Sequence, residues 1–186
     1  MDQDRKAVRE ACDYFGRYLK YHSLKHSLQS SSETAGKNSI QVKEFVFSDS
    51  PEHYRLKDTR FLRLAAGDTS LVWALCRRHP VHLLIADFPY GIQHAPQFGS
   101  RHESFSELLS RVLPYWKKAL LPGGVAAVSF NTLTFPTKQV LEITRASGLS
   151  PVEGGIYSNL RHEVEQAVVR DVVFMINQPL KGGTKI

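Results

Sequence analysis

The sequence predicts an α/β fold in which helices cover both faces of a mostly parallel sheet. Predicted helices and strands alternate along the 186 residues, as they do in parallel sheets, where each crossover passes through a helix. The segment Val81–Ala86 is apolar on both faces, which is typical of a strand at the centre of such a sheet. The length suits one buried core, so residues 1–186 are expected to form a single domain.

The first third of the chain is expected to hold a long helix, a loop and two strands. Apolar residues at three- and four-residue spacing predict a helix over Asp2–Gln29, with Asp4 as its N-cap. The tyrosines of this helix are expected to pack rather than to stack on bases; they are Tyr14, Tyr18 and Tyr21. The polar, serine-rich stretch 30–39 predicts a flexible loop, and strands are expected near 42–47 and 61–65.

The rest of the chain alternates more regularly. Before the third predicted helix, we expect a helix from Gly67 to Cys76 and a loop over 87–103. A helix from Ser104 to Leu120, a turn over 121–124 and a strand over 125–130 are expected to follow. The last predicted elements are a helix over 136–146 and a strand over 166–176 that pairs with a shorter strand near 156–160. Ser104 and Glu107 have the spacing of a capping box. Pro114 is expected to kink the helix that they open.

Composition and charge narrow the class of protein. A net charge of +6 and a pI of about 9.4 favour phosphate-rich partners such as nucleic acids, although solubility alone is the simpler explanation. The longest apolar runs are of strand length, which excludes a membrane span, and the polar N-terminus does not resemble a secretory signal. Cys12 and Cys76 are not spaced like metal ligands, so we expect a reduced, cytoplasmic protein without disulfides or a metal.

A short motif follows the strand Val81–Ala86. An Asp87 oxygen and the Phe88 carbonyl can accept the two hydrogens of an amine, while Tyr90 stacks on the ring that carries it. This arrangement would aim the nitrogen lone pair at a methyl donor by placement alone. Pro89 fixes the turn and Gly91 lets the chain leave it. The simpler interpretation is a strand that ends in an Asp-Pro turn, with Tyr90 covering the core.

The segment Ala86–His94 resembles the amino-methyltransferase motif of an RNA methylase family that includes THUMP-associated tRNA guanine-N2 methyltransferases. DNA adenine-N6 methyltransferases are similar in the same loop. The family pattern is D-P-P-Y-G or D-L-P-Y-G, so Phe88 is a departure, and it affects a position that acts through its main-chain carbonyl. The resemblance implies a class I, Rossmann-like fold that uses S-adenosylmethionine, with Asp87, Phe88, Pro89 and Tyr90 as catalytic residues.

Weaker matches extend the resemblance over most of the chain. Met1–Val8 is similar to the family's second motif, which implies that Asp2 binds the cofactor ribose. Gly67–Thr69 is similar to the third motif, which implies that Asp68, with Thr69 beside it, contacts the adenine amine. The resemblance also implies that Asp87 lies at the cofactor. The turn 121–124 and the segment His162–Asp171 are similar to the turn before the fifth strand and to the final hairpin.

These weaker matches have simpler explanations. Asp2 and Asp68 occupy positions that suit helix caps or turns. Arg170 and Asp171 lie within a β-run, where charged residues more often form an ion pair or mark a sheet edge than belong to a site. The glycine-rich turn that passes under the cofactor's methionine part has no counterpart before Asp87. The resemblance therefore implies an N-terminally truncated domain whose missing half lies outside this chain or in a partner chain, and we expect the chain alone to bind S-adenosylmethionine poorly.

Four functions are consistent with the sequence. The first is methyl transfer to an exocyclic base amine in RNA, with guanine N2 of tRNA favoured by the resemblance. The second is methylation of adenine N6 in DNA, which requires the same arrangement of amine acceptors and a stacking ring. The third is a non-catalytic remnant that binds RNA or a protein partner, and the fourth is an unrelated α/β protein in which the Asp87–Tyr90 motif is a chance turn.

Overall fold

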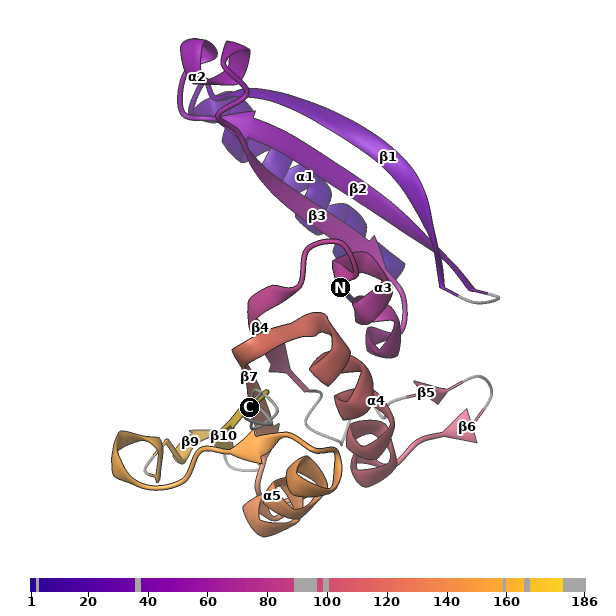
Figure 1. The fold of residues 1–186 in the computed structure, drawn as a ribbon, viewed down its shortest axis with the longest axis vertical. Helices are drawn as coiled ribbons and strands as arrows, with labels where there is room; N and C mark the ends of the chain where they lie inside the picture. The colour runs from indigo at the N-terminus through magenta and orange to yellow at the C-terminus, as the bar shows by residue number, and fades with distance from the viewer. Residues whose placement is uncertain are drawn as a thin grey trace, which may run out of the picture. The chain divides into compact units, whose positions relative to one another are not determined.

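The computed structural model describes residues 1–2, 4–35, 38–88, 97–98, 101–158, 160–165 and 168–178. Its contacts divide the chain into two compact units, Met1–Leu75 and Cys76–Ile186, where the sequence predicted one domain (Figure 1). The division arises because the strands of each unit pair only among themselves. Each unit is therefore described separately.

Unit 1 is a three-stranded antiparallel sheet with one long helix. The sheet has the order β1–β2–β3, formed by Lys25–Ala35, Asn38–Ser48 and Arg60–Ala66. The helices are α1 (Arg5–Tyr21), α2 (Pro51–Arg55), the 3-10 turn η1 (Thr69–Leu71) and α3 (Val72–Cys76). α1 lies along one face of the sheet (Figure 1), where the Phe15 ring meets Phe45 at 5.2 Å and Phe47 at 5.4 Å.

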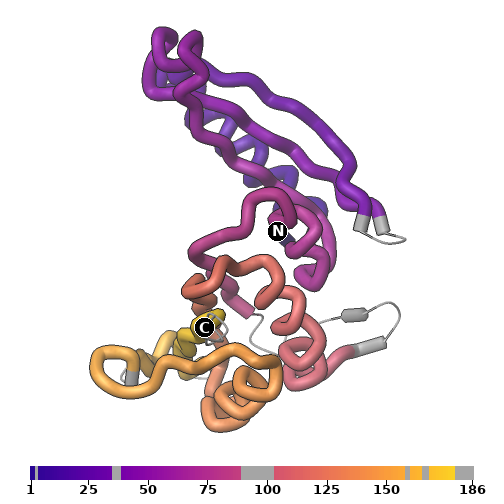
Figure 2. The backbone as a smooth tube through the Cα atoms, in the orientation of Figure 1, coloured from indigo at the N-terminus to yellow at the C-terminus, as the bar shows by residue number. Residues whose placement is uncertain are grey.

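Two predictions for unit 1 are wrong. The first helix does not run to Gln29, because it ends at Tyr21 and Ser23 turns the chain with a φ of 55°. The stretch 30–39 is not a flexible loop: its described residues belong to β1 and β2, which pair in register from Lys25↔Ser48 to Ala35↔Asn38 (Figure 2). β1 is the edge strand of this sheet, so its serines can face solvent while β2 satisfies the backbone.

Other predictions for unit 1 are confirmed. The strands near 42–47 and 61–65 are present, and Asp4 caps α1 by accepting a hydrogen bond of 2.7 Å from the Lys6 amide. The opposite face of the sheet packs on the η1–α3 segment, through the buried residues Ile40, Val42 and Ala65. The N-terminus lies beside the end of β3, where Asp2 forms a parallel bridge with Ala66 (Figure 2).

Unit 2 contains a mixed five-stranded sheet. The strands are β4 (Val81–Asp87), β7 (Leu120–Asn131), β10 (Val168–Ile176) and β8 (Ser150–Pro151) in that order, with β9 (His162–Glu165) also pairing with β10. β4 and β7 are parallel, whereas β10 is antiparallel to its neighbours. The remaining elements are α4 (Phe105–Ala119), α5 (Thr137–Ala146), the turn η2 (Gly155–Ser158) and the ribbon β5–β6 (Gln97–Phe98 and Arg101–His102). The architecture is α/β and compatible with a Rossmann-like fold.

The core of unit 2 lies between this sheet and α4 and α5. α4 begins with the predicted capping box of Ser104 and Glu107 and continues through Pro114. Its buried side includes Leu109, Val112, Leu113 and Trp116, all at most 1% exposed. The Phe105 ring, at the start of α4, stacks on Phe130 of β7 at 6.1 Å. The buried side of α4 therefore faces the even-numbered positions of β7, which include the buried Val128.

Three predictions for unit 2 are wrong. β4 is not central: among the described strands it pairs only with β7, and its Leu83 and Ile85 side chains are 55% and 73% exposed. In the described part of unit 2, α4 and α5 cover the same face of the sheet rather than opposite faces. The segment 156–160 contains no strand in its described part, because 155–158 form η2 and the pairing strand is β9.

The predicted turn at residues 121–124 is a bulge within β7. The register shifts from Val81↔Leu120 to Leu83↔Val125, so the four intervening residues leave the ladder. Gly123 has a φ of 81°, and a Cβ on Gly124 would lie 2.9 Å from the Leu121 carbonyl oxygen. Glycine is therefore required at both positions.

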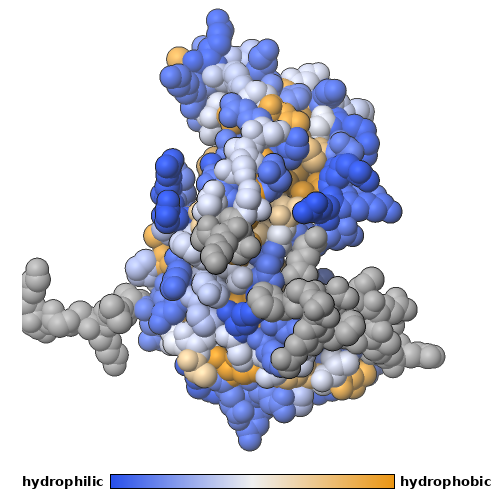
Figure 3. All heavy atoms as spheres, turned by 90° about the vertical axis from the view of Figure 1, so that its right-hand side faces the viewer, coloured by the Kyte–Doolittle hydropathy of each residue, from blue (hydrophilic) through white to orange (hydrophobic). Residues whose placement is uncertain are grey.

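The face drawn in Figure 3 is mostly hydrophilic, with smaller groups of hydrophobic side chains between the polar ones. Within the ranges that the structure describes, no helix combines the length and the apolar character that crossing a membrane would require.

Candidate functional site

Asp87 lies at the carboxyl end of β4, beside the parallel strand β7. Its Cα is in register with Ser129, and the Phe88 amide donates a hydrogen bond of 3.0 Å to the Ser129 carbonyl. Ligand sites in sheets of this kind form at the carboxyl ends of parallel strands. The structure therefore places Asp87 where a ligand site is expected.

Arg170 joins Asp87 at this end of the sheet. It lies on β10 opposite Asn131, and its Nη2 is 3.9 Å from Oδ2 of Asp87. The two side chains are 29% and 61% exposed, respectively. Between them on β7, the buried hydroxyl of Ser129 has no hydrogen-bond partner among the described atoms. A carboxylate, a guanidinium and a hydroxyl thus share one end of the sheet.

A buried amide positions Arg170. Asn131 is 2% exposed, and its Oδ1 accepts hydrogen bonds of 3.1 Å from the amides of Leu133 and Val169. The Thr132 amide adds a bond of 2.8 Å to the Val169 carbonyl. Because these contacts join the end of β7 to the start of β10, they determine where Arg170 leaves the backbone.

Asp171 has a structural role, as the simpler interpretation predicted. It points to the opposite face of the sheet from Arg170, because successive residues of a strand alternate. Its Oδ2 accepts a hydrogen bond of 2.7 Å from the Thr137 hydroxyl, at the first residue of α5. Its Oδ1 accepts one of 2.8 Å from the Val172 amide. Asp171 therefore links β10 to α5 and lies on the opposite face of the sheet from Asp87.

The Phe88 side chain belongs to the core of unit 2. It is 6% exposed, stacks on Trp116 at 5.7 Å and meets Phe105 edge-on at 5.2 Å. Phenylalanine at this motif position is thus explained by packing under α4. Pro89 and Tyr90, like the rest of the motif up to His94, lie outside the described residues, so the stacking role of Tyr90 stays a prediction.

The proposed cofactor acids lie together in unit 1. The Asp2 amide donates 3.1 Å to the Ala65 carbonyl, and the Gly67 amide donates 2.7 Å to the Asp2 carbonyl, so Asp2 lies beside the turn that carries Asp68. Asp2 Oδ1 accepts a 2.8 Å bond from the Asp4 amide. Asp68 Oδ1 accepts a 2.8 Å bond from the Ser70 amide and caps η1, which begins at Thr69. Both acids therefore form the cap and turn contacts that the simpler interpretation predicted, and they share the carboxyl end of β3.

Within the described ranges, no three histidine, cysteine, aspartate or glutamate side chains are close enough to hold a metal ion.

Burial raises the pKa of the Cys12 thiol above its usual value, and the negative charge of Asp13 raises it further, whereas Lys43 opposes the change. The raised pKa favours the neutral Cys12 thiol over the thiolate.

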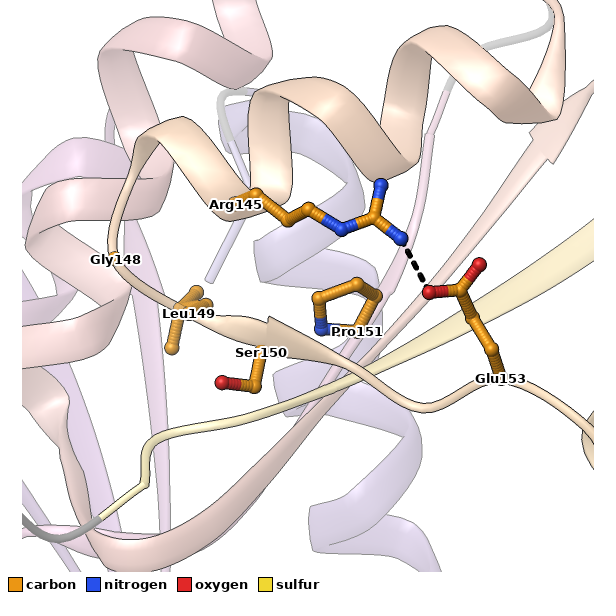
Figure 4. A pocket seen from close by; sticks show the side chains of 6 residues that line it. All are labelled: Arg145, Gly148, Leu149, Ser150, Pro151 and Glu153. Carbon is orange, nitrogen blue, oxygen red and sulfur yellow. Dashed lines mark hydrogen bonds and ion pairs between the residues drawn. The ribbon is translucent and has the colours of Figure 1, made fainter.

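A shallow hollow lies at the other end of the unit 2 sheet. It is lined by Arg145, Gly148, Leu149, Ser150, Pro151 and Glu153, with an ion pair between Arg145 and Glu153 on its rim (Figure 4). Ser150 pairs with Ile176, which in turn pairs with Val125 near the start of β7. The hollow is thus remote from Asp87 along the strands and shares no residue with the candidate site.

No protein-family model matches the chain, and no curated protein matches it. The candidate site therefore depends on the motif and the geometry. Sequence reasoning missed Ser129 and treated Arg170 as a structural feature. The available signal was the charged pair Arg170–Asp171 within the otherwise apolar run of β10, since a charged residue on a half-buried strand requires a nearby partner.

Proposed function

We propose that this chain is an S-adenosylmethionine-dependent methyltransferase domain that acts on an exocyclic base amine in RNA, with guanine N2 of tRNA as the first substrate to test. The observation that carries the proposal is the position of Asp87 at the carboxyl end of β4, next to Ser129 and Arg170. The mixed α/β sheet of unit 2 is compatible with the Rossmann-like fold that such enzymes use.

The chemistry requires only placement of the amine. An Asp87 oxygen and the Phe88 carbonyl accept its two hydrogens, which directs the nitrogen lone pair away from the protein. The positive charge that methylation would place on the amine nitrogen would be stabilised by the Asp87 carboxylate. Asp87 or water then takes the surplus proton. Burial of the Phe88 ring supports this role for its carbonyl, since the side chain fixes the main chain beside Asp87.

Arg170 orients the Asp87 carboxylate. A guanidinium 3.9 Å away attracts the carboxylate oxygen Oδ2. Asn131 fixes the strand that carries Arg170, so the attraction acts from a constant position. Arg170 is thus a positioning residue in this proposal.

The family resemblance assigns the acids at the end of β3, in unit 1, to the adenosine part of the cofactor. Asp2 and Asp68 supply two carboxylates on neighbouring turns, and carboxylates suit ribose hydroxyls and the adenine amine. Thr69 adds a hydroxyl next to Asp68. When bound, S-adenosylmethionine would supply a methyl group activated by its sulfonium. The sequence before Asp87 offers no glycine-rich turn for the methionine part, so we expect weak binding by the chain alone.

Transfer of a labelled methyl group tests the proposal. Wild-type chain, Asp87→Ala and the control Glu163→Gln, an exposed acid on β9, would be incubated at saturating cofactor with unmodified tRNA or an adenine-containing DNA oligonucleotide. We expect transfer to tRNA, a loss of about 100-fold or more in Asp87→Ala, and wild-type activity in the control. Equal activity of Asp87→Ala and wild type would remove Asp87 from the reaction, and preferential transfer to DNA would favour adenine N6.

A second candidate is a non-catalytic remnant that binds RNA or a protein partner. The observation in its favour is the missing glycine-rich turn, combined with the net charge of +6. Calorimetric titration with S-adenosylmethionine separates the two functions when it is combined with the transfer assay. Micromolar binding by the pure chain would refute our expectation of weak binding. Absent transfer at saturating cofactor, with RNA binding retained, would favour the remnant.

A further inference from the structure

A flank of α1, next to its sheet-facing side, carries a row of tyrosines. Tyr14, Tyr18 and Tyr21 are 66%, 44% and 85% exposed, so the predicted packing is limited to the stacking of Tyr18 on Phe15. Spacings of four and three residues place them on one stripe of the helix, about 10 Å long. The adjacent side of α1 supplies the core, where Leu19 is fully buried and Phe15 packs on the sheet. The tyrosines are therefore available to another molecule.

Ring contacts hold part of this row in place. The Tyr18 ring lies 4.4 Å from His22 and stacks on Phe15 at 6.0 Å, with 12° between the two planes. Tyr21 meets His22 edge-on at 5.0 Å. We refer to Tyr14, Tyr18, Tyr21 and His22 as the aromatic stripe. Rings that are already positioned lose less conformational freedom when a flat ligand stacks on them.

The aromatic stripe is set in a basic segment. Residues 14–25 contain Arg17, Lys20 and Lys25 and no carboxylate, whereas the acids Glu10 and Asp13 precede them on the same helix. Arg17 is three residues after Tyr14 and four before Tyr21, so it borders both rings on the helix surface. In the part of the chain that the structure describes, none of these three cations forms an ion pair. Their charge is thus available to an anionic partner.

We infer that the aromatic stripe binds single-stranded RNA, with its rings stacking on bases and the three cations contacting phosphates. Every base offers a flat face to an aromatic ring, and phosphates are attracted by cations that lie beside those rings. A single strand suits this surface better than a duplex, in which neighbouring bases cover those faces. The inference rests on the proposed function only for the choice of nucleic acid as partner, and it concerns binding rather than methyl transfer.

Fluorescence anisotropy with the full chain tests the inference. The probe is a fluorescein-labelled single-stranded RNA of mixed sequence. Its length is about 12 nucleotides, within the range of typical single-strand binding sites, which cover about 4–16 nucleotides. We expect a dissociation constant of about 1–100 µM near physiological salt. The Tyr14→Ala and Tyr21→Ala variants should each lose about fivefold or more in affinity. Arg17→Gln should reduce the slope of log affinity against log salt by about 0.7.

Matched variants separate stacking from changes in fold. Tyr14→Phe and Tyr21→Phe keep the ring and should keep the affinity. Tyr115→Ala removes a tyrosine at 36% exposure that lies beside Lys118 on α4, in unit 2, and should bind RNA like wild type. Circular dichroism and thermal melting of each variant confirm that it is folded. The same RNA annealed to its complement should bind at least about tenfold more weakly.

Three results would overturn the inference. They are RNA affinity unchanged in the double variant Tyr14→Ala/Tyr21→Ala, equal losses in the phenylalanine and alanine variants, and no RNA binding by folded wild-type chain. The last result would favour a protein as the partner of this surface. Glu163→Gln should bind RNA like wild type, because Glu163 lies on β9 in unit 2. Absent methyl transfer with intact RNA binding would count against the proposed function and leave the aromatic stripe in place.

Discussion

Asp87 and Arg170 lie on the same face of the unit 2 sheet, with 3.9 Å between Oδ2 and Nη2, although β7 separates the strands that carry them. The pair reaches across Ser129, whose position in register with Asp87 places it between them. This geometry joins a motif residue to a side chain 83 positions later in the sequence. It determines what each substitution at the site should do.

The Asp87–Arg170 pair should contribute little to stability. Because the Asp87 side chain is 61% exposed, we expect a coupling free energy below about 1 kcal/mol. Urea unfolding of wild type, Asp87→Asn, Arg170→Gln and the double variant measures it as a double-mutant cycle. In the transfer assay Arg170→Lys should retain more activity than Arg170→Gln. A coupling above about 2 kcal/mol would show that the pair is a structural ion pair rather than part of a site.

Phe88→Leu should keep methyl transfer and lose some stability. The side chain packs on Trp116 and Phe105, whereas the proposed reaction uses only the Phe88 carbonyl. We expect a loss in the free energy of unfolding of about 1 kcal/mol for leucine and about 3–5 kcal/mol for alanine. Urea unfolding and the transfer assay check both parts. A folded leucine variant without activity would contradict a role that is confined to the main chain.

Asn177→Ala should destabilise unit 2. The Asn177 carboxamide nitrogen lies 3.3, 3.0 and 3.2 Å from the carbonyl oxygens of Lys117, Leu120 and Leu121, where α4 ends and the β7 bulge begins. Leaving these carbonyls without a donor should cost about 1–3 kcal/mol, measured by urea unfolding. The neighbouring Gln178 is exposed, so Gln178→Ala serves as the control and should change stability by less than about 0.5 kcal/mol.

Cys12 should react slowly with alkylating agents. Burial and the charge of Asp13 raise its pKa in the folded chain, so the midpoint of its iodoacetamide rate against pH should lie above that in urea. The measurement uses Cys76→Ser to isolate the thiol. Since the folded pKa is the higher one, the stability that Cys12 contributes is present below the unfolded pKa and is lost as pH rises through the folded pKa. Cys12→Ser should remove this pH dependence, and equal midpoints in buffer and urea would contradict it.

Local patterns predicted much of the fold. The β4 strand, the Ser104–Glu107 capping box and the Asp4 cap all follow from periodicity and side-chain chemistry, which act over a few residues. The serine-rich stretch failed because β1 is an edge strand, where polar side chains cost little. Its pairing with β2 is a tertiary preference that composition does not reveal.

The candidate site was only partly predictable. Asp87 could be placed at a strand end because an apolar run precedes it directly. The contribution of Arg170 depends on β10 running antiparallel beside β7, which sequence spacing does not specify. The exposure of the α1 tyrosines was not predicted because apolar and aromatic residues follow the same helical spacing, and only the sheet decides which side of the helix is covered.

The pairing of β10 affects how the chain can fold as it is synthesised. β7, β8 and β9 all obtain a backbone partner from β10, which is translated after each of them. The sheet of unit 1, by contrast, is built from strands that are neighbours in sequence. Unit 1 can therefore fold early through local contacts, while nascent unit 2 keeps open strand edges until residues 168–176 leave the ribosome. A ribosome that stalls just before Val168 would leave an aggregation-prone intermediate, and binding of a chaperone to that intermediate would protect it.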